Sequence, residues 1–415
     1  MTPEVKERID QIRRGIVPEG YIKSKDGIYP GDWTSKKIGQ WLQPMERPIS
    51  LEDEEKYELV TVRRRFGGVD SRGTYWGKNV LVKNYFGLRT GDFVISKRQI
   101  AHGACGVVPV ELDGAVVSNE YNVFIPQEGT NINMFNLMMQ LPHYRRLFYL
   151  MSDGVHIEKL LFKTDDWMRR SLAMPSLEEQ EKIASILTMQ DKIIELEQQK
   201  IEEIKKARRF FLEKMFPKEG QTVPEIRFKG FTDPWEQRKF EEIAVRSSAI
   251  CSDVNLPRVE YEDIVSGAGR LNNDIYAKQS SKSGVAFHQG DVLYGKLRPY
   301  LQNWLLPTFD GLAVGDFWVL QPQNADSSFL YRLIQSRQFD EVANQSTGTK
   351  MPRADWKLVS KTVFSIPSNI SEQAAIGTFF SALDSLITLH QRKLEEEKNK
   401  KKALMQLLLT GIVRV

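Results

Sequence analysis

Apolar residues recur at spacings of four and seven positions in two separate stretches of the chain. They are Ile183, Leu187, Ile194 and Ile201 in the first stretch and Ile376, Phe380, Ile387 and Leu394 in the second. This spacing places apolar side chains along one stripe of a helix and is typical of a coiled-coil seam. A Pro-Ser pair and acidic residues precede each stretch, which suits the start of a helix. We therefore predict two long helices, over residues 176–216 and 367–415, that form an antiparallel coiled coil.

The two helical stretches are copies of one another. Residues 179–205 align with residues 372–398 at a constant offset of 193, and eleven of these 27 positions are identical. About two identities would be expected from average composition. The identical residues include the pair Glu179-Gln180, which recurs as Glu372-Gln373. An internal duplication explains this agreement better than chance.

Weaker matches precede each helix in the same order, with offsets that drift by a few residues as loop insertions require. They pair Trp33 with Trp235, Gly91-Asp92 with Gly290-Asp291, Lys97 with Lys296, and Asp166-Trp167 with Asp355-Trp356. The chain is therefore predicted to be a tandem duplication. After a charged helical arm over residues 1–25, globular domains cover residues 26–175 and 217–366, and one long helix follows each domain.

The globular halves combine strand and helix patterns. Short or alternating apolar runs bounded by Gly, Asp and Pro predict strands in the first half. These runs cover residues 57–62, 92–95, 106–110 and 121–125. A helix is expected over 131–149, interrupted at Pro142, and its pattern recurs over 327–341. The predicted fold class is α+β, with two duplicated domains separated by the paired helices and related by a pseudo-twofold axis.

Composition narrows the class of protein only a little. With 415 residues and 41% hydrophobic content, the chain can bury a core, and its length favours two or more domains. It has no apolar run of about 18 residues, so we expect a soluble, cytoplasmic protein without a membrane partner. Cys105 and Cys251 are interpreted as ordinary core residues. The net charge of +4 permits a polyanionic partner without requiring one.

Lys and Arg residues clustered in loops are candidates for contact with a nucleic acid. Affinity for a duplex comes from cations near phosphates, and specificity needs Arg, Lys, Asn or Gln at base edges. The candidates are Arg63, Arg64, Arg65, Lys97, Arg98, Arg270, Lys296, Arg298, Lys350 and Arg353. For any one of them, the ordinary alternative is a solvated surface cation. The three consecutive arginines are the strongest candidates, because adjacent cations repel one another unless a polyanion faces them.

Several short motifs occur in the same order in both halves. They are YPGDW and TDPWEQRKF around Trp33 and Trp235, and GDFVISKRQI and GDVLYGKLRPY from Gly91 and Gly290; the second half also has STGTKMPRADW at residues 346–356. In this order, together with the duplicated helices, they resemble the specificity subunit of type I restriction-modification enzymes across nearly the whole chain.

That resemblance implies a non-catalytic protein without a cofactor, in which each half is a target-recognition domain for one part of a bipartite site in double-stranded DNA. It implies that the helices set the spacing and dock two modification (methyltransferase) subunits, with restriction (endonuclease and translocase) subunits joining the complex. The halves differ where Lys97-Arg98-Gln99-Ile100 stands in place of Lys296-Leu297-Arg298-Pro299. Different base targets would require such variation.

Catalytic functions find little support in the sequence. Gly267-Ala268-Gly269 and Asp233-Pro234-Trp235 are the nearest approaches to methyltransferase motifs, and neither has the required context. No P-loop sequence occurs, and the five histidines are dispersed without metal-ligand spacing. One of them, His390, is expected to be solvated on a helix face. The alternative to a DNA reader is a duplicated coiled-coil scaffold that binds only protein partners.

Overall fold

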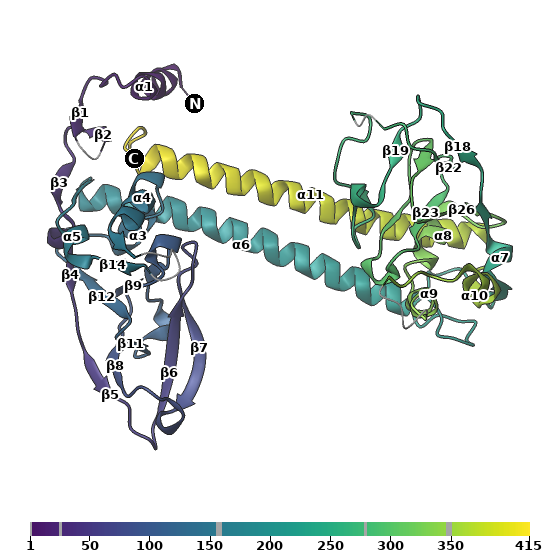
Figure 1. Cartoon of the computed structure of the whole chain (residues 1–415), viewed down its shortest axis with the longest axis horizontal. Helices are drawn as coiled ribbons and strands as arrows, with labels where there is room; N and C mark the ends of the chain where they lie inside the picture. The colour runs from purple at the N-terminus through teal and green to yellow at the C-terminus, as the bar shows by residue number, and fades with distance from the viewer. Residues whose placement is uncertain (1, 25–26, 155–159, 278–279, 346–350) are drawn as a thin grey trace. The chain divides into compact units, whose positions relative to one another are not determined.

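The chain consists of two compact units, which the computed structural model describes over residues 2–24, 27–154, 160–277, 280–345 and 351–415. One unit is Met1–Leu196 with Leu394–Val415, and the other is Glu197–Lys393. Each holds one sheet-containing domain and a part of each long helix, α6 (Leu177–Lys214) and α11 (Ile370–Leu408), drawn teal and yellow in Figure 1. Within the described residues, no helix is long and apolar enough to cross a membrane.

The domain of the first unit is built on two sheets, with strand orders β10-β9-β12-β4 and β5-β8-β11-β6-β7. Their strands are β4 (Leu42–Pro44), β5 (Pro48–Ser50), β6 (Lys56–Val62), β7 (Val69–Trp76), β8 (Asn84–Gly87), β9 (Phe93–Ser96), β10 (Cys105–Val107), β11 (Val116–Ser118) and β12 (Tyr121–Pro126). Successive residues of β9 point to opposite faces. Val94 packs with the β6 residue Val60, whereas Phe93 and Ile95 pack with helical residues, so both faces are buried.

The domain of the second unit repeats this arrangement, with strand orders β17-β26-β23-β24 and β18-β22-β25-β19. Its strands are β17 (Ala244–Ser247), β18 (Ile250–Cys251), β19 (Arg258–Val259), β22 (Gly284–Phe287), β23 (Val292–Gly295), β24 (Trp304–Leu305), β25 (Gly311–Ala313) and β26 (Phe317–Pro322). A parallel pair stands at the equivalent place in both units, β6 with β11 and β19 with β25. The predicted α+β duplication is thus confirmed, and β7 is an additional strand at the edge of the first unit's five-stranded sheet.

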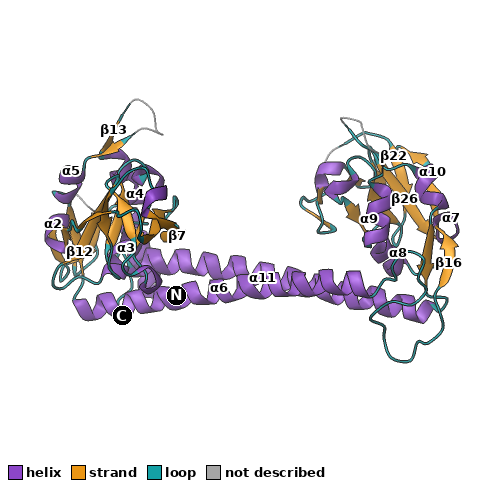
Figure 2. Ribbon diagram, turned by 90° about the horizontal axis from the view of Figure 1, so that it is seen from below, coloured by secondary structure: helices purple, strands orange, loops and turns teal. Residues whose placement is uncertain are grey.

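A pair of short helices follows the last strand of the main sheets in each domain. They are α3 (Ile132–Met138) and α4 (Pro142–Leu150) in the first, and α8 (Ser327–Leu333) and α9 (Arg337–Ala343) in the second. Pro142 is the first residue of α4, a position where its missing N–H costs nothing. Asn131 and Asp326 cap α3 and α8, each accepting a hydrogen bond from the third residue of its helix. Figure 2 shows these helices beside the strands of their own domain.

Two sequence expectations are wrong in extent. The arm over residues 1–25 is helical only in α1 (Pro3–Arg13), because Gly15, at φ 76°, ends the helix. The strand expected over 106–110 stops at Val107, because Pro109 has no N–H for a ladder and begins a short 3-10 helix instead.

The remaining helices and strands are short. They are β1 (Tyr21–Ser24), β2 (Gly27–Pro30), β3 (Thr34–Lys37), α2 (Ile38–Trp41), β13 (Ser152–Asp153), β14 (Leu161–Phe162), α5 (Thr164–Met168), β15 (Ser171–Met174), β16 (Glu236–Lys239), α7 (Phe240–Ile243), β20 (Ile264–Val265), β21 (Arg270–Leu271), α10 (Trp356–Lys361) and β27 (Val363–Ile366).

Within each unit the two long helices pack antiparallel. In the first unit Lys401 forms an ion pair with Asp191 at 2.5 Å, and in the second Arg208 pairs with Asp384 at 2.6 Å. At the offset of 193, Asp191 corresponds to Asp384 and Arg208 to Lys401. The duplicated helices therefore form the same interhelical ion pair twice.

The seam between the helices continues into the domain cores. Of the predicted seam residues, Ile183, Leu187, Ile201, Ile376 and Phe380 are buried, and Ile194, Ile387 and Leu394 are half-buried. Ile183 belongs to the same apolar cluster as Leu408 of α11 and Trp167 of the first domain. The expectation of a solvated His390 is wrong, because its side chain is only 13% exposed and its Nδ1 lies 2.8 Å from Glu197 Oε2.

The repeated Glu-Gln pair at the start of each long helix joins that helix to its domain. Gln180 Oε1 accepts a hydrogen bond from the backbone N–H of Asn131 at 2.8 Å, and Gln373 Oε1 accepts one from that of Asp326, also at 2.8 Å. Both glutamines are 1% exposed. Since Asn131 and Asp326 cap α3 and α8, each glutamine fixes the helix pair of its domain against the long helix.

The Glu197 contacts predict a pH dependence of stability. Hydrogen bonds from Lys393 and His390 hold the pKa of Glu197 below its ordinary value of 4.5. Their contribution is therefore present above about pH 4.5 and is lost as the pH falls through the lowered pKa. We expect Glu197→Gln to reduce the free energy of unfolding in urea at about pH 7 and to have a smaller effect at about pH 3, nearer to the lowered pKa. An equal reduction at both pH values would contradict this, and Glu195→Gln, on the same helix, is the matched control.

The two cysteines differ in burial. Cys105 is buried on β10, and burial raises the pKa of its thiol. Cys251 is only half-buried, on the edge strand β18, where its Sγ accepts the backbone N–H of Asp253. The expectation that both are core residues is thus wrong for Cys251.

Candidate nucleic-acid interface

The triple arginine lies in the turn between β6 and β7, and the backbone of this turn is strained. Arg65 and Phe66 have φ values of 60° and 58°, a region that non-glycine residues rarely adopt. The backbone N–H groups of Arg65 and Phe66 donate to the carbonyls of His102 and Gly103, at 2.7 and 2.8 Å. A Cβ at Gly103 would lie 2.8 Å from the Phe66 ring, so glycine allows this approach. Strain maintained by such contacts is common at functional sites.

These hydrogen bonds place the turn beside the segment that follows Lys97 and Arg98, since His102 and Gly103 belong to that segment. Arg98 forms an ion pair with Glu120 at 2.6 Å, and Lys97 donates through Nζ to a backbone carbonyl. Arg63 is paired with Asp70. Arg64 and Arg65 are exposed, and Arg65 forms no ion pair with any residue that the structure describes.

In the second unit, two predicted segments meet at a turn that begins with Arg298. Arg298 has φ 48° and Gln302, at the end of the turn, has φ 56°. The N–H of Arg298 donates to the carbonyl of Pro352 at 2.7 Å, and Leu297 forms an isolated β-bridge with Arg353. The GKLRPY segment is thereby joined to the segment just after residue 350. Lys350 itself lies outside the described residues.

The cations around this turn share one carboxylate. Arg353 Nη2 lies 3.0 Å and Lys296 Nζ 3.5 Å from Asp316. The hydrogen bond from Arg353, more than the charge of Lys296, holds the pKa of Asp316 below its usual range. Arg298 differs, because its Nε is buried without a hydrogen-bond partner among the described residues. Arg270 is exposed on β21 and forms no part of this cluster.

The segments that begin at Lys97 and Lys296 are held by equivalent backbone contacts. The carbonyl of Lys97 accepts the N–H of Phe162, and that of Lys296 accepts the N–H of Ala354, both at 2.9 Å. The side chains that follow differ, since Gln99 stands where the second half has Arg298. A common backbone frame with different side chains is what two readers of different base sequences need.

Sequence reasoning missed the groups that hold these loops. Burial raises the pKa of Tyr261 to about 12, and its hydroxyl donates to the carbonyl of Leu297 beside Arg298. Glu120 and Asp316 occupy equivalent positions, because their backbone carbonyls accept the N–H groups of Lys97 and Lys296. Aligning the repeats would have revealed this pair of acids, because each lies at the start of the strand that pairs with β9 or β23.

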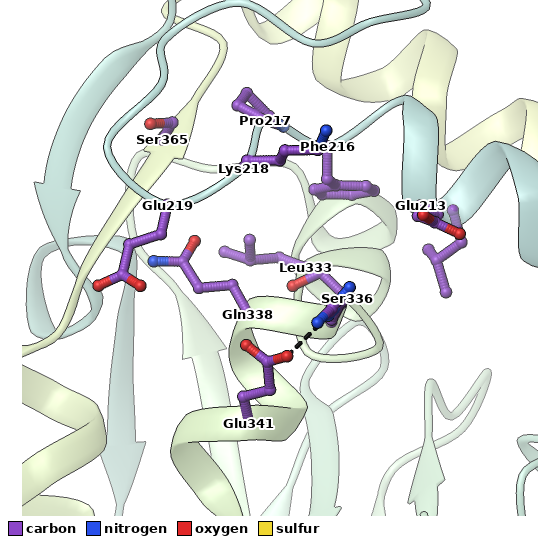
Figure 3. Close-up of a pocket in the computed structure, with 12 residues that line it drawn as sticks. Glu213, Phe216, Pro217, Lys218, Glu219, Leu333, Ser336, Gln338, Glu341 and Ser365 are labelled. Carbon is purple, nitrogen blue, oxygen red and sulfur yellow. Dashed lines mark hydrogen bonds and ion pairs between the residues drawn. The ribbon is translucent and has the colours of Figure 1, made fainter.

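A pocket of about 270 Å³ near the end of α6 does not belong to this interface. Figure 3 shows the apolar side chains of Phe216 and Leu333 together with the carboxylates of Glu213, Glu219 and Glu341. These three carboxylates outnumber the two basic side chains that line the pocket, Lys218 and Arg337, and Arg337 already pairs with Glu341, so the pocket does not attract phosphate groups. The pocket therefore does not suit a nucleic acid.

The structure does not place the two candidate methyltransferase motifs in the surroundings that such motifs require. Gly267-Ala268-Gly269 forms the turn of the β20-β21 hairpin and does not connect a strand to a helix. Trp235, of the Asp-Pro-Trp motif, is buried in the domain core. Within the part of the chain that the structure describes, no group of three His, Cys, Asp or Glu residues could hold a metal ion.

A family model described as type I restriction modification DNA specificity domain matches this chain twice, over residues 30–206 and 233–398. Among proteins of similar sequence, the type I restriction enzyme MjaVIII specificity subunit of Methanocaldococcus jannaschii is 21% identical over 435 residues, covering 96% of this chain and 97% of that protein. The type I restriction enzyme EcoDI specificity subunit of Escherichia coli is 25% identical over 155 residues, covering 35% of each chain.

Two solved structures are similar over most of their length. The type I restriction-modification S subunit from M. genitalium has a TM-score of 0.56 at 14% identity and covers 91% of this chain and 96% of that one. A chain from a structure of the type I R-M system, solved to explain complex assembly and conformational transition, has a TM-score of 0.57 at 15% identity, with 93% and 99% covered. At these identities the likeness shows the fold alone.

Proposed function

Because this chain belongs to the family of type I restriction-modification DNA specificity proteins, we propose that each of its halves reads one part of a bipartite site in double-stranded DNA. The observation that carries the proposal is the strained turn in each domain, where Arg65 and Arg298 adopt positive φ beside further cations. An arginine held in this way can present its guanidinium to a guanine edge in the major groove. The recognition domains would cover residues 26–175 and 217–366.

We further propose that the chain acts only by binding and that partner subunits carry out the chemistry. Exposed apolar side chains on both long helices support docking of a protein partner. They are Ile186, Met189 and Leu196 on α6, and Leu386 and Leu389 on α11. Leu196 and Leu389 correspond at the offset of 193. Two copies of a modification subunit would dock on these helices, with restriction subunits joining this complex in the cytoplasm.

The recognition role is tested by co-expressing the full chain with its modification subunit and mapping methylated adenines across a genome. We expect a two-part motif with a fixed gap. Replacing residues 26–175 with those of another specificity subunit should then change one half of the motif only. If an intact complex methylates without sequence preference, the coiled-coil scaffold becomes the better interpretation.

The spacing role predicts the effect of lengthening the helices. Inserting seven residues into α6 and seven at the matching place in α11 preserves the seven-residue repeat and adds about 10 Å of helix. We expect the gap between the half-sites to grow by about three base pairs, since base pairs stack about 3.4 Å apart. The same methylation mapping measures the gap. An unchanged gap would show that the helices do not set it.

A further inference from the structure

A cleft of about 970 Å³ in the second unit adjoins the candidate interface described above at Gln302. It is lined by the turn of the β20-β21 hairpin, by Trp304 and by segments of both long helices. Six basic side chains line it, against the two carboxylates of Glu202 and Asp384. The excess of positive charge indicates an anionic ligand.

Both carboxylates are already engaged. Asp384 pairs with Arg208 at 2.6 Å and with Arg332 at 2.7 Å, and Glu202 pairs with Lys205 at 2.8 Å. The other three basic residues are Arg209, Arg270 and Arg392. All three are exposed, and none forms an ion pair within the described part of the chain. Their charges are therefore available to a ligand.

The wall of the cleft also contains buried donors without acceptors. Trp304 Nε1 and Arg332 Nε have no hydrogen-bond partner among the described residues, although these residues are only 4% and 2% exposed. A Cβ at Gly269 would lie 3.5 Å from Trp304 Cδ1, so the N–H edge of the indole faces the hairpin turn that lines the cleft. Buried donors normally have partners. A ligand rich in acceptor oxygens would supply them.

We propose that this cleft binds phosphate groups of DNA, extending the interface of the second domain from its recognition turn onto α6 and α11. The cleft adjoins that turn, because the N–H of Gly267 donates at 3.0 Å to the carbonyl of Gln302, which ends the turn begun by Arg298. A phosphate group offers both the negative charge and several acceptor oxygens. This inference rests on the proposed function. A free nucleotide carries the same phosphate chemistry, and the test separates the two sources.

The test uses the full chain with its modification subunits and a duplex carrying the mapped site. Binding constants are measured at several salt concentrations for the parent and for the triple variant Arg209→Ala, Arg270→Ala, Arg392→Ala. Each lost phosphate contact lowers the salt slope by about 0.9, so we expect the slope to fall by about 2 to 3 and the affinity at about 0.1 M salt to fall at least about tenfold. The recognised sequence should not change, because phosphate contacts carry no base information.

The matched control removes three exposed lysines of the same unit that do not line the cleft, Lys229, Lys239 and Lys357. It should bind with the parent slope. If the parent complex binds its site but the triple variant keeps the same slope, the proposal for DNA is overturned while the proposed function stands. If the parent shows no sequence-specific binding, the proposed function fails first.

A calorimetric titration with AMP and inorganic phosphate completes the test. Suppose that the parent binds AMP or phosphate at one site, that the triple variant loses this binding, and that the salt dependence of DNA binding is unchanged. The cleft would then bind a free nucleotide and not DNA. Loss of the modification subunits from the triple variant, with DNA affinity unchanged, would assign the cleft to an acidic protein segment and overturn the phosphate assignment.

Discussion

Replacing Glu372 with alanine should destabilise the second unit by about 3 to 5 kcal/mol. Glu372 is 1% exposed, and Arg227 donates to both of its oxygens, from Nε at 2.6 Å and from Nη2 at 2.8 Å. Trp235 Nε1 donates to the same carboxylate at 3.2 Å. Without the carboxylate, a guanidinium that is 14% exposed loses its charge partner and a buried indole N–H loses its acceptor. Urea unfolding followed by tryptophan fluorescence measures the loss.

An exposed ion pair of the same domain provides the control. Glu236 lies 2.6 Å from Arg238, and their side chains are 46% and 31% exposed. Glu236→Ala should therefore cost at most about 1 kcal/mol. Glu179→Ala, at the equivalent position of the first unit, should destabilise that unit less than Glu372→Ala does, because its partner Arg414 also pairs with Asp32. If Glu372→Ala lowers the free energy of unfolding no more than Glu236→Ala does, the attachment of α11 to its domain does not depend on the Glu372–Arg227 ion pair.

The duplicated Glu-Gln pair shows how far the sequence could predict the fold. Its recurrence at an offset of 193 identifies the repeat, and seven-residue spacing identifies the seam, because both are patterns in the order of the residues. The reason for the pair's repetition became visible only in three dimensions. Gln180 and Gln373 bind the caps of helices that lie about 50 residues earlier in the chain, and no local pattern encodes such a partner.

The candidate interface could be predicted in composition but not in geometry. The sequence identified Arg63 to Arg65 and the segments around Lys296 and Arg353 as basic loops. It could not show that Leu297 pairs with Arg353, since this bridge joins distant parts of the chain. Nor could it show positive φ at Arg65 and Phe66, because tertiary contacts with the His102 segment impose that conformation on residues that disfavour it.

Charge pairing is the second aspect that sequence alone could not resolve. Ten cations were candidates for DNA contact, and the structure commits several of them to carboxylates within their own domain. Arg63, Arg98, Lys296 and Arg353 have such partners in Asp70, Glu120 and Asp316. These four are better suited to shaping loops than to reading bases. Arg65, Arg270 and Arg298 form no ion pair with the described residues, and we propose that Arg65 and Arg298, which lie in the two strained turns, contact base edges.

Arg298→Ala should relax recognition in one half of the DNA site and leave the other half unchanged. A bidentate contact from arginine to guanine contributes about 1 to 3 kcal/mol of discrimination. We therefore expect up to about a 100-fold loss of preference at one base position. The measurement is the methylation rate of duplexes that carry single-base changes across both half-sites. Arg298→Lys should lose most of this preference but retain the salt dependence of binding, because lysine keeps the charge without the planar pair of donors.

Arg65→Ala provides the matching experiment in the first domain. Arg65, like Arg298, has a positive φ and forms no ion pair with a residue that the structure describes, so its loss should relax one position in the opposite half of the motif. Since the two residues lie in different compact units without shared partners, the losses in the double variant should add within about 0.5 kcal/mol. A single substitution that altered preference in both halves equally would contradict independent reading, because one guanidinium cannot contact bases in two separate half-sites.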